Sequence, residues 1–337
     1  MIKHAMLSSL LLLLACKGNS SKSFIFRYCN SQHENHPRSQ SMEYFKEILE
    51  KRTFGRIQVE NYFSAVLGTE FEIQDMVATG ALQGTRGGGF PNANKKYNLF
   101  MLPFLVENWD EAIRLLSSTF TQKINAEARQ NGYHVPACGI SQGFRAHTNN
   151  VKPIESPADI KGLKMRVPQQ EVYVINAQIL KANPQEIPSS EIYMALKLGV
   201  VDGQDNPVSN IWDNKIYEVQ KYLSITNYSM GPDPFMVNLE WYKKLPEDLQ
   251  HIFDQTAIEA VKYSDKLSRD NEAEYTAKLS KKLKINYVTV ENLEKFRKAT
   301  EPVYQYFVDK GYFTWDDINE ARACSKSNQT TLSIAEQ

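Results

Sequence analysis

The sequence predicts an α/β fold in two lobes, and three observations lead to this class. Strand and helix patterns alternate from residue 24 to residue 79, as in a parallel or mixed sheet with helices on its faces. The chain has 337 residues, 42% of them hydrophobic, which is enough for two separate cores. Residues 247–284 contain no glycine or proline, and their broken apolar stripe predicts one helix of about 50 Å. Such a helix would span both lobes, whereas an unmarked kink would divide it into two helices.

The first strand–helix unit follows from the spacing of apolar residues. Its expected elements are a strand at Phe24–Tyr28, a helix at Ser39–Thr53, a strand at Arg56–Phe63 and a helix at Phe71–Thr79. Because ligands collect at the carboxyl ends of strands in such sheets, the loops after Tyr28 and Leu82 are candidate parts of a site.

A second unit is expected between Tyr133 and Ile225. Its predicted strands are Gly143–His147, Leu163–Val167 and Val200–Asp202, and its predicted helices are Glu171–Lys181 and Ser190–Leu198. Between the units, a helix is predicted over Trp109–Asn131 with Asn108 as its N-cap, and near the C-terminus another over Trp315–Arg322.

The N-terminus has the pattern of an export signal. Lys3 and His4 precede an apolar run of about ten residues, which is too short to span a bilayer. The run ends at Leu13-Leu14-Ala15-Cys16, which resembles the bacterial lipobox. We therefore expect a signal peptide at residues 1–15, lipidation of Cys16 and a polar tether over residues 16–23, the alternative being an ordinary signal peptide with an incidental cysteine.

Composition excludes several partners and cofactors. Lysine plus arginine equals aspartate plus glutamate at 39 each, so no net field favours nucleic acid. Cys29, Cys138 and Cys324 show no CxxC spacing, and His33 and His36 lack further ligands nearby, so no metal or other cofactor is expected. Cys29 and Cys138 could form a disulfide, but buried free thiols are favoured.

Arg166 is the most informative single residue. It lies between Met165 and Val167 in a short apolar strand that Pro168 ends. A guanidinium in this setting needs an anionic partner, either from the protein or from a ligand, to offset its desolvation.

Four segments resemble the substrate-binding proteins of TRAP transporters, the DctP family. They are Ser156–Pro168, Gly199–Pro207, Lys215–Leu223 and Tyr242–Gln250, and the similarity extends in order over nearly all of residues 24–310. The resemblance implies a two-lobe periplasmic binding protein fold with mixed sheets, a hinge and a long helix shared by both lobes. It also implies a cleft that closes on an organic acid and delivery to a TRAP permease with small and large membrane subunits.

The fold implied by the resemblance divides the chain. The first lobe is expected to comprise residues 24–142 and 232–270, and the second lobe residues 143–231 and 271–300, with residues 301–337 forming C-terminal helices and a tail. The mature protein is expected in the periplasm, anchored to a bacterial membrane by its N-terminal lipid.

The resemblance also assigns ligand contacts in the second lobe. It places the carboxylate-binding arginine at Arg166, whose planar guanidinium can bind both carboxylate oxygens. Arg145 and Asn206 are implied in the same pocket. Alternatively, Arg145 pairs with Glu155 on the surface, and Asn206 only forms a turn before Pro207.

Contacts from the first lobe are expected in two loops. Residues 30–36 follow the first strand, and the resemblance implies polar contacts there from His33, Glu34 or Asn35, of which we select Glu34. In the other loop, Arg86 adds a second positive contact or is a solvated loop arginine. Three glycines follow it at residues 87–89, where relatives carry side chains, so we expect a ligand bulkier than a four-carbon diacid, or backbone amides in place of those contacts.

Phe235 and Trp212 are selected as aromatic cleft walls because both lie in loop-like segments after strand or helix ends. The residues show no set of nucleophile, base and orienting group, which favours binding without turnover over an enzyme. The alternative from another class is a ligand-sensing binding protein coupled to a membrane sensor.

Overall fold

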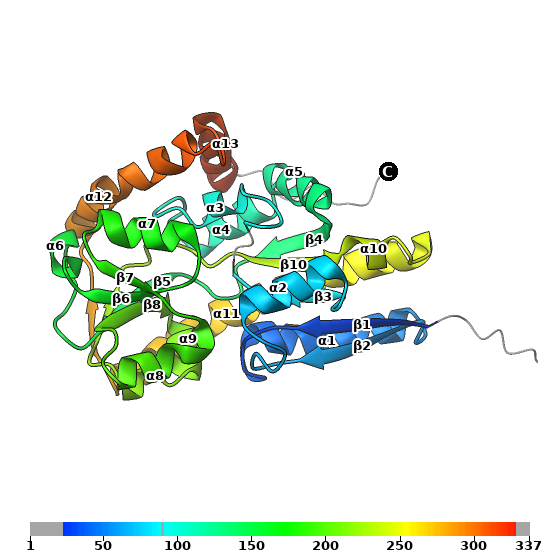
Figure 1. The fold of residues 1–337 in the computed structure, drawn as a ribbon, viewed down its shortest axis with the longest axis horizontal. Helices are drawn as coiled ribbons and strands as arrows, with labels where there is room; N and C mark the ends of the chain where they lie inside the picture. The colour runs from blue at the N-terminus through cyan, green and yellow to red at the C-terminus, as the bar shows by residue number, and fades with distance from the viewer. Residues whose placement is uncertain (1–22, 89–90, 328–337) are drawn as a thin grey trace, which may run out of the picture.

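The computed structural model describes residues 23–88 and 91–327, which form two α/β lobes side by side (Figure 1). The predicted signal peptide, Cys16 and residues 17–22 of the tether lie outside the described residues, as do Gly89 and the tail from residue 328. Each lobe is built on one mixed sheet, so the predicted fold class is confirmed.

The first lobe contains a five-stranded sheet in the order β2-β1-β3-β10-β4. Strand β1 pairs in parallel with β2 and β3, whereas β10 runs antiparallel to β3 and β4. The strands are β1 (Phe24–Cys29), β2 (Ile57–Tyr62), β3 (Gly84–Arg86), β4 (Tyr133–Gly139) and β10 (Asp233–Asn238).

The second lobe contains a six-stranded sheet in the order β11-β9-β5-β8-β6-β7. Its parallel core is β8, β6 and β7, with β5 antiparallel to β8 and β9. The strands are β5 (Arg145–Asn149), β6 (Lys164–Val167), β7 (Asn183–Glu186), β8 (Gly203–Pro207), β9 (Tyr222–Ile225) and β11 (Lys284–Tyr287).

Helices cover both faces of each sheet, as the alternating pattern requires. In the first lobe they are α1 (Pro37–Arg52), α2 (Glu70–Thr79), α3 (Tyr97–Phe100), α4 (Trp109–Leu116), α5 (Thr119–Glu127), η1 (Ala128–Asn131) and α10 (Leu239–Tyr242). In the second they are α6 (Pro157–Ile160), α7 (Glu171–Ile179), η2 (Ser189–Glu191), α8 (Ile192–Lys197), α9 (Val208–Asp213) and η3 (Ile216–Glu218). Helices α12 (Val290–Asp309) and α13 (Trp315–Lys326) connect the lobes, since α12 packs on α7 and α13 on α4 and α5.

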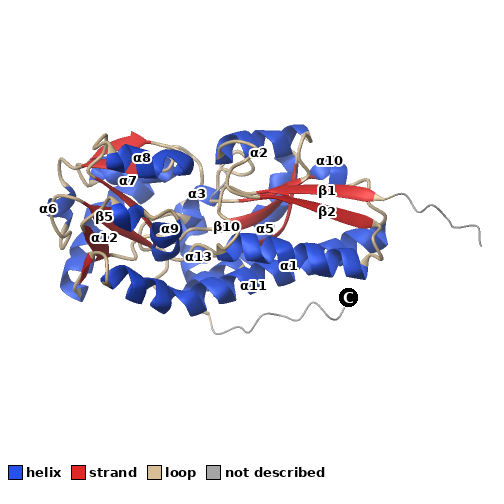
Figure 2. Ribbon diagram, turned by 90° about the horizontal axis from the view of Figure 1, so that it is seen from below, coloured by secondary structure: helices blue, strands red, loops and turns tan. Residues whose placement is uncertain are grey.

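Besides the connection from α12 to α13, three segments of the described chain cross between the lobes. Residues 140–144 and 226–232 run side by side, joined by the Gly231 N–H to the Gly143 carbonyl at 3.0 Å. The third is α11 (Glu247–Ser280), a single helix of 34 residues that packs on α1 in one lobe and α9 in the other. Figure 2 shows it extending beneath both lobes. The long shared helix is confirmed, and the alternative of two helices is wrong.

Two predicted elements differ from the structure. The predicted helix over residues 109–131 is divided, because the Ser117 hydroxyl bonds back to the Ile113 carbonyl at 2.7 Å while Ser118 caps α5. Asn108 does cap α4, accepting the Glu111 N–H at 3.0 Å. The strand expected at residues 200–202 begins instead at Gly203. The residue limits predicted for the lobes remain a prediction, since secondary structure alone does not fix where a rigid unit ends.

The core of the first lobe is an aromatic cluster between the sheet and the helices α1 and α11. Phe253 of α11 lies with its ring centroid 5.1 Å from Phe26, 5.3 Å from Phe45 and 5.9 Å from Phe235. All four rings are fully buried. Their mutual packing fixes the long helix on the first lobe.

Phe253→Ala is expected to lower the free energy of unfolding by about 3–5 kcal/mol, because it removes a buried ring from a close-packed cluster. Urea denaturation followed by circular dichroism measures the loss. Phe54→Ala is the matched control, since Phe54 is 92% exposed, and a similar loss in both variants would contradict this account of the core.

Candidate ligand-binding site

A pocket lies between the two lobes at the carboxyl end of β6. We call it the interlobe pocket, and it is lined by Glu70, Phe71, Arg166, Pro168, Gln169, Gln170, Pro188 and Ser189. The first two residues begin α2 of the first lobe, and the other six belong to the second lobe. Strands β6 and β7 are parallel, so their carboxyl ends meet at this edge of the sheet, where ligands bind in open α/β sheets.

Arg166 is the buried cation of this pocket, with 3% of its surface exposed. Its Nε donates to the Ile187 carbonyl at 2.8 Å, which fixes the guanidinium plane against the end of β7. Within residues 23–88 and 91–327, no carboxylate forms an ion pair with Arg166, unlike the other buried arginines. Burial lowers the pKa of Arg166 to about 9, and the nearby charge of Arg145 adds to this effect. An anion beside Arg166 would offset both the desolvation of the guanidinium and its repulsion by Arg145.

Arg145 is also buried, but its charge is neutralised within the protein. Its Nε forms an ion pair with Asp205 of β8, and its Nη2 donates to the Asp205 carbonyl at 2.6 Å. The Tyr228 hydroxyl donates to the same carboxylate at 2.6 Å, and the Tyr173 ring lies 4.5 Å from the guanidinium carbon. Burial would lower the pKa of Arg145, but Asp205 raises it above its usual value. The alternative of a surface pair with Glu155 is therefore wrong.

Asn206 belongs to a chain of buried amides that crosses between the lobes. It lies in β8 rather than in a turn, donates to Gln204 Oε1 at 2.5 Å and accepts from Asn210 Nδ2 at 3.1 Å. Asn210 Oδ1 is in turn 3.0 Å from Nε2 of His36, the N-cap of α1. Since His36 Nδ1 accepts the Arg38 N–H at 3.1 Å, Nε2 carries the proton and donates to Asn210. This contact joins the lobes directly.

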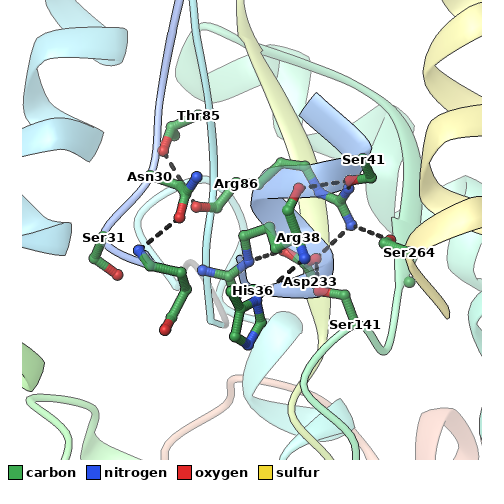
Figure 3. Close-up of polar contacts among 12 residues, drawn as sticks. Asn30, Ser31, His36, Arg38, Ser41, Thr85, Arg86, Ser141, Asp233 and Ser264 are labelled. Carbon is green, nitrogen blue, oxygen red and sulfur yellow. Dashed lines mark hydrogen bonds and ion pairs between the residues drawn. The ribbon is translucent and has the colours of Figure 1, made fainter. Parts of the chain in front are cut away.

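Arg86 is neither a solvated arginine nor an unpaired one. It is buried in β3 and forms an ion pair with Asp233, which also pairs with Arg38 Nε at 3.1 Å (Figure 3). Its Nη1 donates to the Ser41 hydroxyl at 2.6 Å, and its Nη2 donates to the Ser264 hydroxyl at 2.9 Å. The partners come from β10, α1 and α11, so Arg86 ties these elements together inside the first lobe.

The remaining selected residues lie outside the interlobe pocket. Glu34 is exposed, and His36 is the residue of its loop that reaches the other lobe. Phe235 is in the middle of β10 and fully buried in the aromatic cluster. The prediction that it lies in a loop and forms a wall of the cleft is therefore wrong. Trp212 stacks on Tyr217 at 4.8 Å against the core of the second lobe and is not a pocket residue. A Cβ on Gly88 would meet Nε2 of Gln170, the N-cap of α7, at 3.3 Å, so Gly88 lies close to the start of that helix.

Sequence reasoning missed Glu70 and selected Glu34 in place of His36. A signal for Glu70 exists in Thr69-Glu70-Phe71-Glu72, a capping box in which Glu72 Oε2 accepts the Thr69 N–H at 2.7 Å. The box places Glu70 in the first turn of α2, where the helix dipole favours a carboxylate.

The three described cysteines do not line the interlobe pocket. Cys29 and Cys138 are buried free thiols, as favoured from the sequence. The part of the chain that the structure describes contains no group of three or more His, Cys, Asp or Glu side chains able to hold a metal ion. It also contains no helix of the length and hydropathy needed to traverse a bilayer.

Two α/β lobes, the segments that cross between them and a buried cation with no ion-pair partner in the described structure define a solute-binding protein of the two-lobe class. The chain belongs to the DctP family, described as bacterial extracellular solute-binding protein, family 7, whose family model matches residues 29–310. The family recognised from the sequence motifs is confirmed.

Relatives support the same assignment over most of the chain. The sialic acid-binding periplasmic protein SiaP of Vibrio cholerae is 30% identical over 273 residues, covering 79% of this chain and 83% of SiaP. A TRAP periplasmic solute-binding protein from Haemophilus influenzae, solved with L-gulonate, is 28% identical with a TM-score of 0.85, covering 90% of this chain and 100% of that one. The sugar acid-binding protein DctPAm of Advenella mimigardefordensis, solved with galactonate, is 26% identical with a TM-score of 0.85, covering 90% and 98%.

The chain covers less than two thirds of the length of two further relatives. It spans 65% of a Haemophilus influenzae protein, at 33% identity over 216 residues, and 50% of protein y4mM of Sinorhizobium fredii, at 31% identity over 271 residues.

Asp205→Asn is expected to lower the free energy of unfolding by about 3–5 kcal/mol, because it leaves the Arg145 charge buried without a counter-ion. Chemical denaturation measures the loss. Asp110→Asn removes the exposed partner of Arg269 and serves as the control, with an expected change below about 1 kcal/mol. Equal losses in the two variants would contradict the view that Asp205 neutralises Arg145.

Proposed function

We propose that this protein is the extracytoplasmic receptor of a TRAP transporter, which captures an organic acid by its carboxylate as the two lobes close. The observation that carries the proposal is the guanidinium of Arg166, buried between the lobes with no carboxylate partner among the described residues. A ligand carboxylate would accept two hydrogen bonds from Nη1 and Nη2 while Nε stays on Ile187. The acids bound by similar proteins, L-gulonate, galactonate and D-erythronate, support this ligand class.

The other buried groups take supporting roles in this proposal. Arg145, held by Asp205, adds positive potential behind Arg166. Asn206 in β8 accepts a hydrogen bond from Asn210 and so orients its side chain. The His36–Asn210 contact forms when the first lobe meets the second. Closure then removes the carboxylate–guanidinium pair from water, which strengthens it.

Delivery and location follow from the same proposal. The acid passes to a permease with small and large membrane subunits, and the lipobox-like Cys16 anchors the receptor to a bacterial membrane from the periplasmic side. Membership of a family of extracellular solute-binding proteins supports this location and supports binding without catalysis.

Arg166→Lys is expected to weaken binding at least about 100-fold, because an ammonium group cannot engage both carboxylate oxygens in one plane. Isothermal titration calorimetry with a panel of sugar acids and short dicarboxylates measures the effect. Arg269→Lys, on the exposed side of α11, is the matched control. An unchanged dissociation constant for Arg166→Lys would refute the assignment.

Acid is expected to weaken binding through His36. Burial lowers the pKa of His36 to about 3, with the charge of Arg38 as the next cause. The ring is therefore neutral in the closed form, where Nδ1 accepts the Arg38 N–H and Nε2 donates to Asn210. In an open form the ring is hydrated and titrates nearer its usual value of about 6.5. Protons therefore favour the open form, and affinity should fall as the pH drops from about 6.5 towards 4.

His36→Gln tests this pH dependence, since the amide can donate to Asn210 but does not titrate in this range. Calorimetry between pH 7.5 and 4.5 should show a smaller decline for the variant than for the parent protein. Equal pH profiles would show that His36 does not couple protons to closure.

A further inference from the structure

Glu70 provides the only carboxylate among the described residues that line the interlobe pocket. Its side chain is 26% exposed, so solvent and ligands can reach it. The Ser31 hydroxyl donates to its Oε1 at 2.8 Å and holds it in place at the start of α2. The charge of Glu70 also acts on Arg166 of the opposite lobe, where it partly offsets the lowering of the Arg166 pKa. The two residues therefore face one pocket from opposite sides.

Glu70 also covers a second cation. Arg38 Nη1 lies 3.7 Å from Glu70 Oε1, and the Arg38 side chain is fully buried. Among the described residues, neither Nη1 nor Nη2 of Arg38 has a hydrogen-bond partner. A ligand in the pocket therefore meets the carboxylate of Glu70 before it meets the guanidinium of Arg38.

The charges around the pocket leave room for one negative group. Arg38 and Arg86 are balanced by Asp233 and Glu70, and Arg145 is balanced by Asp205. Arg166 is the guanidinium without such a partner in the described structure. Burial raises the pKa of Asp265, which lies near Arg86, to about 7, and any charge it keeps adds to the negative side. A second ligand carboxylate would thus bring an uncompensated charge into a buried site.

We propose that the pocket selects hydroxylated monocarboxylates, and that Glu70 determines this specificity by repelling a second carboxylate and accepting hydrogen bonds from ligand hydroxyl groups. This inference rests on the proposed function, because it takes Arg166 as the anchor of the single carboxylate. Arg86 does not bind a second ligand carboxylate in this proposal, because Asp233 already neutralises its charge.

Matched acids that differ at one end provide the test. Calorimetry at fixed ionic strength compares erythronate with meso-tartrate, xylonate with xylarate, and galactonate with galactarate, so that each pair differs only in a terminal hydroxymethyl or carboxylate group. The parent protein should bind at least one monoacid, and that monoacid at least about tenfold more tightly than its diacid. Glu70→Gln should reduce this preference at least about tenfold, by tightening diacid binding and weakening monoacid binding. Glu47→Gln, the same change at an exposed site on α1, should leave the preference unchanged.

The outcomes separate this inference from the function on which it rests. Equal or tighter binding of the diacids, a preference that survives Glu70→Gln, or no binding of any monoacid would overturn the role of Glu70. In each of these cases, binding of another carboxylate that Arg166→Lys abolishes would leave the receptor function intact. Carboxylate binding that is unaffected by Arg166→Lys would overturn both. Thermal denaturation of Glu70→Gln checks that the variant is folded, and Glu70→Asp, which keeps the charge, should retain the preference for monoacids.

Discussion

The structure depends on one electrostatic constraint: a guanidinium group is held between two lobes, almost out of contact with water, with no carboxylate of the described protein beside it. Burying a charge costs several kcal/mol unless a partner compensates it. Every neighbouring buried arginine has such a partner, as Arg145 has Asp205, and Arg38 and Arg86 share Asp233. Arg166 has instead a single carbonyl contact and an electropositive neighbour, so the compensation is left to a ligand.

The fold holds this charge at a place that can open and close. Strand β6 ends at the pocket, and the parallel pairing with β7 supplies the Ile187 carbonyl that orients the guanidinium. Two adjacent segments and helix α11 connect the lobes, and α11 is anchored by the aromatic cluster on one side and by α9 on the other. The lobes touch again at His36 and Asn210, which lie 174 residues apart in the sequence. A rigid strut on one side and a polar contact on the other suit a hinge motion in which ligand binding and lobe contact occur together.

Features that depend on local sequence could be predicted, and those that depend on distant partners could not. The 34-residue helix follows from an uninterrupted run without glycine or proline, and Arg166 stands out because Met165 and Val167 flank it. The partner of Arg86 is 147 residues away, so no local pattern shows that its charge is already neutralised. Gly231, Pro232 and Pro234 precede Phe235 and suggest a loop. In the structure Phe235 belongs to β10, which lies between β3 and β4 inside the sheet.

 The capping box at Thr69 places Glu70 at the start of α2, but the local sequence does not show that Glu70 lies opposite Arg166, because Arg166 belongs to the other lobe.

The central claim is that the carboxylate of a bound acid compensates Arg166. A crystal structure of the purified protein, grown with the tightest-binding acid found by calorimetry, tests it most directly. We expect one ligand carboxylate within hydrogen-bond distance of both Nη1 and Nη2 of Arg166, with Nε still donating to the Ile187 carbonyl. A ligand carboxylate bound elsewhere, with Arg166 in contact only with protein groups or solvent, would contradict it.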